Sequence, residues 1–179
     1  MNLPNRITLF RIALIPIFLA FFYWLPHGEA WAALVFVIAA FSDALDGKIA
    51  RKRDLITTLG KFIDPLADKL LVLTALAVLV DRNMLPVMVF LIILWRDIAV
   101  DGLRIVAASK GKVIAASQWG KWKTACQLVT TTVLLLSRLP WWPQPLYTVV
   151  CRALIGLTVL LTVFSAYDYF RKGWMYLKG

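Results

Sequence analysis

Residues 42–69 read SDALDGKIARKRDLITTLGKFIDPLADK, in which Asp43, Asp46, Asp64 and Asp68 stand among apolar residues and a fifth aspartate, Asp54, lies in the charged run between them. An ionised carboxylate is costly in or beside a bilayer, and it is rarely kept there without a partner. Four carboxylates together most simply indicate bound divalent cations, which prefer oxygen ligands. This stretch therefore predicts an enzyme, not a scaffold.

The composition of the whole chain indicates an integral membrane protein. The 179 residues suffice for one domain, but 61% are hydrophobic and the mean hydropathy is +0.76, too apolar for a soluble protein. A formal net charge of +10 would suggest nucleic acid in a soluble protein. Here the basic residues cluster at the ends of apolar segments, where anionic headgroups lie, so no nucleic-acid partner is expected.

Six apolar segments, separated by charge, proline or glycine, are each long enough to cross a bilayer as a helix, which takes about 20 residues. The expected fold is all-α, a single membrane domain over residues 1–179 with its chemical motif at residues 43–68. Its six transmembrane helices are expected at residues 7–25, 30–51, 60–80, 85–107, 119–139 and 147–170. The first segment has no clear cleavage site, so it is expected to be a retained helix and not a signal peptide.

Lysine and arginine collect at alternate ends of these segments. They crowd the N-terminus, the second and fourth connections and the C-terminal tail, whereas the other three connections carry few. Because cytoplasmic loops collect positive charge, both termini are expected in the cytoplasm. The chain is therefore predicted to be a multi-pass protein of the cell (inner) membrane with its aspartates on the cytoplasmic side. His27 falls in a predicted outer loop, where it should be solvated.

Helical periodicity of about 100° per residue places the four aspartates on two faces, which can oppose each other in an antiparallel pair. The first face holds Asp43, Asp46, Gly47 and Ala50, with Arg51 at its edge, and the second holds Gly60, Asp64 and Asp68.

This arrangement of carboxylates suits displacement at phosphorus. Four of them can hold two hard cations a few ångströms apart and leave positions open for phosphate oxygens. Gly47 and Ala50 leave room for a nucleotide to approach the backbone, and Arg51 can pair with a pyrophosphate. The alternative is that the acids form ion pairs with nearby lysines and arginines, although surface pairs stabilise too little to require such spacing.

These eight positions match the pattern DxxDGxxAR(x8)GxxxDxxxD in full, so the chain resembles the CDP-alcohol phosphatidyltransferase family. The resemblance implies a six-helix membrane fold, a homodimer and two divalent cations, magnesium or manganese. It implies that Asp68 is also the general base toward the acceptor hydroxyl. The metal ligands it implies are Asp43, Asp46, Asp64 and Asp68, and the residues that contact the CDP donor are Gly47, Ala50, Arg51 and Gly60.

Residues 4–11, PNRITLFR, resemble the PNxxTxxR element of the same family, which contributes to nucleotide binding. Asn5, Thr8 and Arg11 stand at three-residue steps on one helical face. The resemblance implies that Asn5 and Thr8 help to bind the donor. In the alternative, Asn5 caps a helix and Arg11 extends to the lipid headgroups.

Residues 95–127, WRDIAVDGLRIVAASKGKVIAASQWGKWKTACQ, bear on the acceptor alcohol. Their cations can neutralise a second phosphate, which favours an acceptor that is itself a phosphate ester. The stretch resembles the corresponding region of bacterial phosphatidylglycerophosphate synthases in the segments 102–104, 113–117 and 120–124. The alternative is that this basic loop only attracts anionic lipid. The expected acceptor-binding residues are Arg104, Lys112, Lys121 and Lys123.

The resemblance thus implies transfer of a phosphatidyl group from CDP-diacylglycerol to sn-glycerol 3-phosphate, among membrane lipids. Phosphatidylglycerol, inositol phosphate and serine are alternative acceptors. A more distant alternative is an ion or proton transporter, although a relay should spread its acids across the membrane depth. Arg96, Asp97 and Asp101 in the fourth segment are expected to face the bundle interior, as ion pairs or in contact with substrate.

Overall fold

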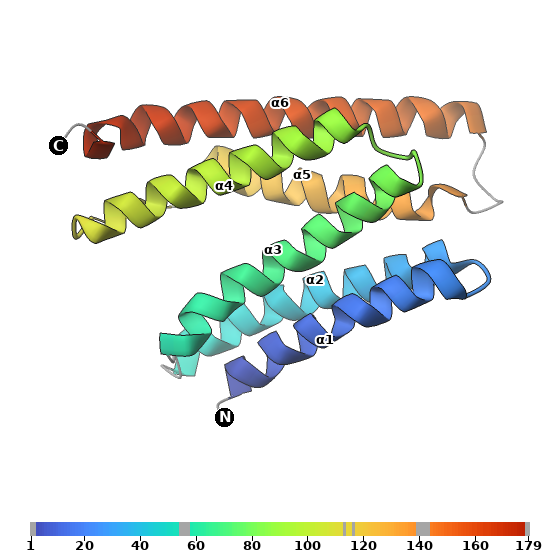
Figure 1. The fold of residues 1–179 in the computed structure, drawn as a ribbon, viewed down its shortest axis with the longest axis horizontal. Coiled ribbons are helices and arrows are strands. Elements are labelled where there is room, and N and C mark those ends of the chain that lie inside the picture. The colour runs from blue at the N-terminus through green and yellow to red at the C-terminus, as the bar shows by residue number, and fades with distance from the viewer. Residues whose placement is uncertain (1–2, 54–57, 113, 116, 139–143, 178–179) are drawn as a thin grey trace. The chain divides into compact units, whose positions relative to one another are not determined.

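The computed structural model describes residues 3–53, 58–112, 114–115, 117–138 and 144–177, and it is helical apart from short turns and connections. Each of the six segments expected to be helical forms a helix there, so their number and order are confirmed over these residues. The helices are α1 (Leu3–Trp24), α2 (Gly28–Arg53), α3 (Thr58–Asp81), α4 (Val87–Ser109), α5 (Gln118–Leu135), the short 3-10 helix η1 (Leu136–Arg138) and α6 (Gln144–Leu177) (Figure 1).

Local sequence explains how α4 begins and ends. Pro86 immediately precedes the helix, at a position where the N–H that proline lacks would have no intrahelical partner. At the other end Gly111 has a φ of +71°, a left-handed conformation that glycine adopts readily because it has no Cβ. The N–H of Lys112 then donates to the carbonyl of Ala107 over 2.9 Å, which closes the last turn.

Helix α6 continues beyond the apolar segment that predicts it. Arg171 and Lys172, which the charge pattern assigned to a tail, lie within the helix. Lys172 Nζ donates to Asp168 Oδ2 one turn earlier over 2.9 Å, a pairing that supports the helix. The charges therefore mark the end of the apolar run and not the end of the helix.

One stretch of α6, Tyr147–Trp174, is long and apolar enough to cross a membrane, the one such helix among the described residues. Only 22% of its most apolar window is buried. A core helix of a soluble protein would be largely buried, so this exposure fits contact with lipid. Leu9–Trp24 and Gly28–Ala40 are shorter apolar helical stretches. Six crossings and the sidedness of the termini remain predictions.

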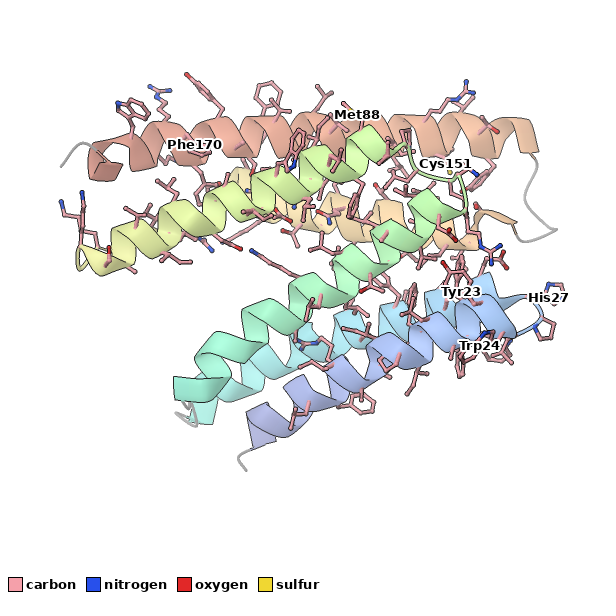
Figure 2. The ribbon with its side chains drawn as sticks, in the orientation of Figure 1. Tyr23, Trp24, His27, Met88, Cys151 and Phe170 are labelled. Atoms are coloured by element: carbon pink, nitrogen blue, oxygen red, sulfur yellow. The ribbon has the colours of Figure 1, made fainter. Side chains whose placement is uncertain are left out.

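The chain forms two compact units, Met1–Leu79 with Thr131–Trp142, and Val80–Thr130 with Pro143–Gly179. Whether they make the single domain expected from the sequence remains a prediction. In the first unit α1 and α2 pack as an antiparallel hairpin (Figure 1). His27 is exposed in the turn at the tip of this hairpin, as expected (Figure 2). The buried residues of the hairpin include large rings and small alanines, which let helices approach closely: Phe18, Phe22, Ala32, Ala33, Phe36 and Ala39.

In the second unit α4 packs against α6 in parallel orientation, and α5 runs in the opposite direction (Figure 1). Buried hydroxyls link α5 to α6. The Oγ1 atoms of Thr130 and Thr158 lie 2.8 Å apart, and Cys126 Sγ lies 3.3 Å from the same Thr158 oxygen. Such hydrogen bonds hold helices together where lipid removes the hydrophobic drive for association.

Candidate functional site

The four aspartates lie at matching distances from the connection between α2 and α3. Asp43 stands ten residues before the end of α2, and Asp68 stands ten residues after the start of α3. At a rise of 1.5 Å per residue both are about 15 Å from the connection. Asp46 and Asp64 stand seven and six residues away, which is about 10 Å.

Helix α3 begins five residues after α2 ends and runs back in the opposite direction within the same unit (Figure 1). The backbone is therefore compatible with two opposed acidic faces. Among the side chains that the structure describes, no group of three or more His, Cys, Asp or Glu could hold a metal ion. At the predicted ligands and donor contacts the structure describes the course of the backbone only: Asp43, Asp46, Gly47, Ala50, Arg51, Gly60, Asp64 and Asp68. Their shared site remains a prediction.

The predicted donor-binding residues Asn5 and Thr8 lie in the first turns of α1, with side chains outside the described part of the chain. Arg11, which follows on the same face, is buried with only 3% of its surface exposed. A guanidinium that extends to lipid headgroups would be exposed, so this burial disfavours the lipid interpretation of Arg11. The role of Asn5 and Thr8 in donor binding remains a prediction.

The four predicted acceptor-binding cations lie in one unit but in different environments. Lys112 and Lys121 are exposed, just after α4 and at the start of α5. Arg104 is half-buried on α4, and Lys123 is buried on α5. The sequence did not distinguish these four residues, so their surroundings decide what each can do.

Lys123 is paired with Asp97 of α4. Its ammonium donates to both carboxylate oxygens, over 2.7 and 2.9 Å. Arg96 donates to the same carboxylate over 2.9 Å. Arg96 and Asp97 were expected either to form an ion pair or to contact substrate, and the ion pair is confirmed. Asp101 is half-buried one turn further along α4.

Arg104 is held by a neutral group. Its Nη2 donates to the phenol oxygen of Tyr169 over 3.0 Å, and its guanidinium carbon lies 5.3 Å from the centre of that ring. Its Nε is buried without a hydrogen-bond partner, and no carboxylate pairs with it within the described residues. The charge of Arg104 is therefore available to an anion.

The polar face of α6 to which Arg104 binds was not among the sites predicted from the sequence. On this face Arg96 donates to Ser165, and Tyr169 follows four residues later. The spacing of four, three and four residues is a signal that could have found it, because a polar stripe at helical spacing in an apolar helix predicts a buried polar face. The stripe, which is buried throughout, is Thr158, Thr162, Ser165 and Tyr169.

Comparison with known proteins decides which family these features belong to. Residues 1–164 match the profile described as CDP-alcohol phosphatidyltransferase. The chain belongs to the CDP-alcohol phosphatidyltransferase family. This family is membrane-embedded, and the matched region includes all eight positions of the aspartate pattern.

Members of the family with curated names are similar over nearly the whole chain. The CDP-diacylglycerol--glycerol-3-phosphate 3-phosphatidyltransferase of Bacillus subtilis (strain 168) is 43% identical, over 99% of this chain and 97% of its own length. The protein of the same name from Pseudomonas fluorescens is 37% identical, over 99% and 93%. The Arabidopsis thaliana protein of that name numbered 2 is 36% identical, over 98% and 81%. The likeness is therefore not confined to the aspartate pattern.

Proposed function

We propose that this chain transfers the phosphatidyl group of CDP-diacylglycerol to sn-glycerol 3-phosphate, giving phosphatidylglycerophosphate and CMP in phospholipid biosynthesis. The observation that carries this proposal is the full-length similarity to relatives whose names state this reaction. The similarity includes residues 95–127, which bear on the choice of acceptor. Donor chemistry is assigned to the aspartate pattern at residues 43–68, which lies in the first of the two compact units.

The proposed cofactor is a pair of divalent cations, magnesium or manganese, held by Asp43, Asp46, Asp64 and Asp68. The donor set fits, because ionised carboxylates are the ligands that hard cations prefer. The matching distances of these positions from the α2–α3 connection support a shared site. When bound, the cations would offset negative charge on the attacking and departing oxygens.

Asp68 is the proposed general base, and its carboxylate accepts the proton of the free primary hydroxyl of glycerol 3-phosphate. The hydroxyl oxygen forms a bond to the phosphorus that bears the diacylglycerol. The bond from this phosphorus to the bridging oxygen breaks, and its electron pair leaves on that oxygen as part of CMP. Positioning of the two substrates supplies much of the acceleration, and no covalent enzyme intermediate is needed.

The donor nucleotide is proposed to lie against α1, α2 and α3. Two of the positions are glycines, where the backbone itself can be approached, and Arg51 can pair with the pyrophosphate. Arg11 on the same helical face is buried, which argues against its extension to lipid headgroups, the alternative interpretation of this element. The proposed donor contacts are Asn5, Thr8, Gly47, Ala50, Arg51 and Gly60.

The acceptor phosphate is proposed to bind Arg104, Lys112, Lys121 and Lys123. Arg104 is the best supported, because its guanidinium is oriented without a carboxylate partner in the described part of the chain. Lys112 and Lys121 are exposed and can meet a soluble acceptor. Lys123 is bound by Asp97, so it adds to the local positive field more than to direct contact.

We propose six membrane-spanning helices in the cell (inner) membrane, with both termini and the active site facing the cytoplasm, and a homodimer as the assembly. The α-helices have from 18 to 34 residues. These lengths correspond to about 27 to 51 Å, which compares with roughly 30 Å of hydrocarbon. The acyl chains of the donor would then lie among the membrane lipids.

The experiment supplies purified protein with magnesium and labelled CDP-diacylglycerol, together with one of four alcohols. These are glycerol 3-phosphate, phosphatidylglycerol, inositol phosphate and serine. We expect labelled phosphatidylglycerophosphate and release of CMP with glycerol 3-phosphate alone. A labelled lipid from another alcohol, or ion flux in liposomes without CDP-lipid, would contradict the proposal.

A further inference from the structure

Tyr169 joins three helices through one phenol oxygen. The residue lies on α6 and is buried, with 4% of its surface exposed. Its oxygen accepts a hydrogen bond from Arg104 of α4 and another from the backbone N–H of Ser117, the residue before α5, each over 3.0 Å. The side chain therefore sets the position of a cation and of a helix start at the same time.

The ring of Tyr169 also contacts two cations. The guanidinium carbons of Arg96 and Arg104 both lie 5.3 Å from its centre, within the range of cation–π attraction. The Nε atoms of both arginines are buried without a hydrogen-bond partner among the residues that the structure describes. Tyr169 thus restrains two arginines while it carries no charge.

The start of α5 is built against the same phenol. Ser117 Oγ accepts the N–H of Gly120 over 3.1 Å, an N-terminal cap of the helix. A Cβ added at Gly120 would lie 3.1 Å from Cε2 and 3.2 Å from Oη of Tyr169. Glycine therefore lets the first turn of α5 approach the ring closely. This turn leads directly into Lys121 and Lys123.

Tyr169 and Asp97 differ in the charge that they bring to the cations they bind. Asp97 brings a full negative charge to Lys123, which shares that carboxylate with Arg96. The phenol of Tyr169 accepts a hydrogen bond from Arg104 but leaves the guanidinium charge uncancelled. A carboxylate in the place of the Tyr169 phenol would compete with an anionic substrate for Arg104. The neutral phenol orients the Arg104 guanidinium and leaves its charge to the substrate.

We propose that Tyr169 is a positioning residue for acceptor recognition, which holds Arg104 and the start of α5 in place without neutralising the Arg104 charge. This inference rests on the proposed role of Arg104 in binding the acceptor phosphate. Tyr169 is thus proposed to affect acceptor binding by orienting Arg104, without contacting the acceptor itself.

The test is Tyr169→Phe, which removes the phenol oxygen and keeps the ring. We expect the KM for glycerol 3-phosphate to rise about tenfold, the size expected when a hydrogen bond to a charged group is lost. The kcat and the KM for CDP-diacylglycerol should stay within about twofold, because the donor site is untouched. Tyr167→Phe is the matched control, since Tyr167 is exposed on the same helix and should change none of these values.

A double-mutant cycle with Arg104→Gln separates positioning from a purely structural role. If Tyr169 acts through Arg104, adding Tyr169→Phe to Arg104→Gln should raise the acceptor KM by less than about twofold more. Additive effects, a fall in kcat alone or a Tyr169→Phe protein that does not fold would overturn the inference. Wild-type protein that makes no phosphatidylglycerophosphate would instead overturn the proposed function, so the two failures are distinguishable.

Discussion

The ammonium of Lys123 and the carboxylate of Asp97 form a buried ion pair, with Nζ 2.7 Å from Oδ1 and only 4% and 14% of the two side chains exposed. The pair connects α5 to α4, and Arg96 shares the carboxylate. Lys121, two residues before Lys123, is exposed. Two lysines that look equivalent in the sequence therefore differ in how much of their charge remains for a substrate.

The pair predicts that Lys123→Met lowers the stability of the protein. Removal of the ammonium leaves Asp97 buried with Arg96 alone, and we expect the free energy of unfolding to fall by about 3 kcal/mol. Thermal denaturation in detergent measures this effect. Lys123→Met combined with Asp97→Leu should be less destabilised than the single variant, and Lys121→Met should match the wild type. Equal Tm values for Lys121→Met and Lys123→Met would refute the assignment.

Lys121→Ala tests the contribution of the exposed cation to acceptor binding. We expect the KM for glycerol 3-phosphate to rise about fivefold with an unchanged kcat, because a contact made equally before and during the reaction is lost. Arg152→Ala, at an exposed position on α6, is the control and should leave the acceptor KM unchanged. A change in the donor KM that depends on anionic lipid content would favour the lipid-attraction interpretation.

Replacement of the predicted ligands should abolish transfer. Asp43→Asn, Asp64→Asn and Asp68→Asn are each expected to lower kcat at least about 1,000-fold, because cation binding or proton removal is lost. Initial rates of CMP release, measured on protein shown to be folded by its Tm, check this. Asp81→Asn at the exposed end of α3 should retain wild-type activity. A fully active Asp64→Asn protein would contradict the two-cation proposal.

Removal of divalent cations should stop the reaction without unfolding the protein. Treatment with EDTA is expected to lower CMP release to background, because four carboxylates without cations repel the phosphates of both substrates. Magnesium or manganese added in excess should restore the rate. Activity that persists after exhaustive chelation would rule out the proposed cofactor.

The hydroxyl pair between α5 and α6 predicts a stability effect distinct from catalysis. Thr158→Val should lower the free energy of unfolding by about 1 kcal/mol, because it removes the interhelical hydrogen bond to Thr130. Thr130→Val should lower the free energy of unfolding by less in the Thr158→Val protein than in the wild type, which thermal denaturation can measure. Thr124→Val is the control, since in the described part of the chain the hydroxyl of Thr124 bonds within its own helix, to the Gly120 carbonyl over 3.1 Å. Loss of activity per folded molecule in Thr158→Val would contradict this role.

The helices were predictable because apolar runs and charge breaks are local. All six expected segments are helical in the described part of the chain, with ends that shift by a few residues. The largest shift is in α6, which runs on through Arg171 and Lys172 to Leu177. A charged side chain is unfavourable in the hydrocarbon of the bilayer and so ends the apolar run, but it leaves the backbone hydrogen bonds of the helix intact.

The contacts of the basic stretch were not predictable in the same way. Lys123 meets Asp97 across 26 residues of chain, and Arg104 meets Tyr169 across 65. Helical spacing predicts which residues share a face of one helix, but it does not say which face of another helix they meet. Charge alone therefore predicts the acceptor-binding set, and it does not distinguish a cation paired with a carboxylate from one held by a neutral phenol.

The amino-acid sequence by itself determined the family and the predicted chemistry of the aspartates, because eight residue types at fixed gaps are a covalent property of the chain. It also determined where the helices lie, because apolar periodicity acts over a few residues. The tertiary structure alone decided that Asp97 pairs with Lys123 and that Tyr169 orients Arg104. Such pairings depend on the packing of whole helices, which brings distant side chains within hydrogen-bond reach.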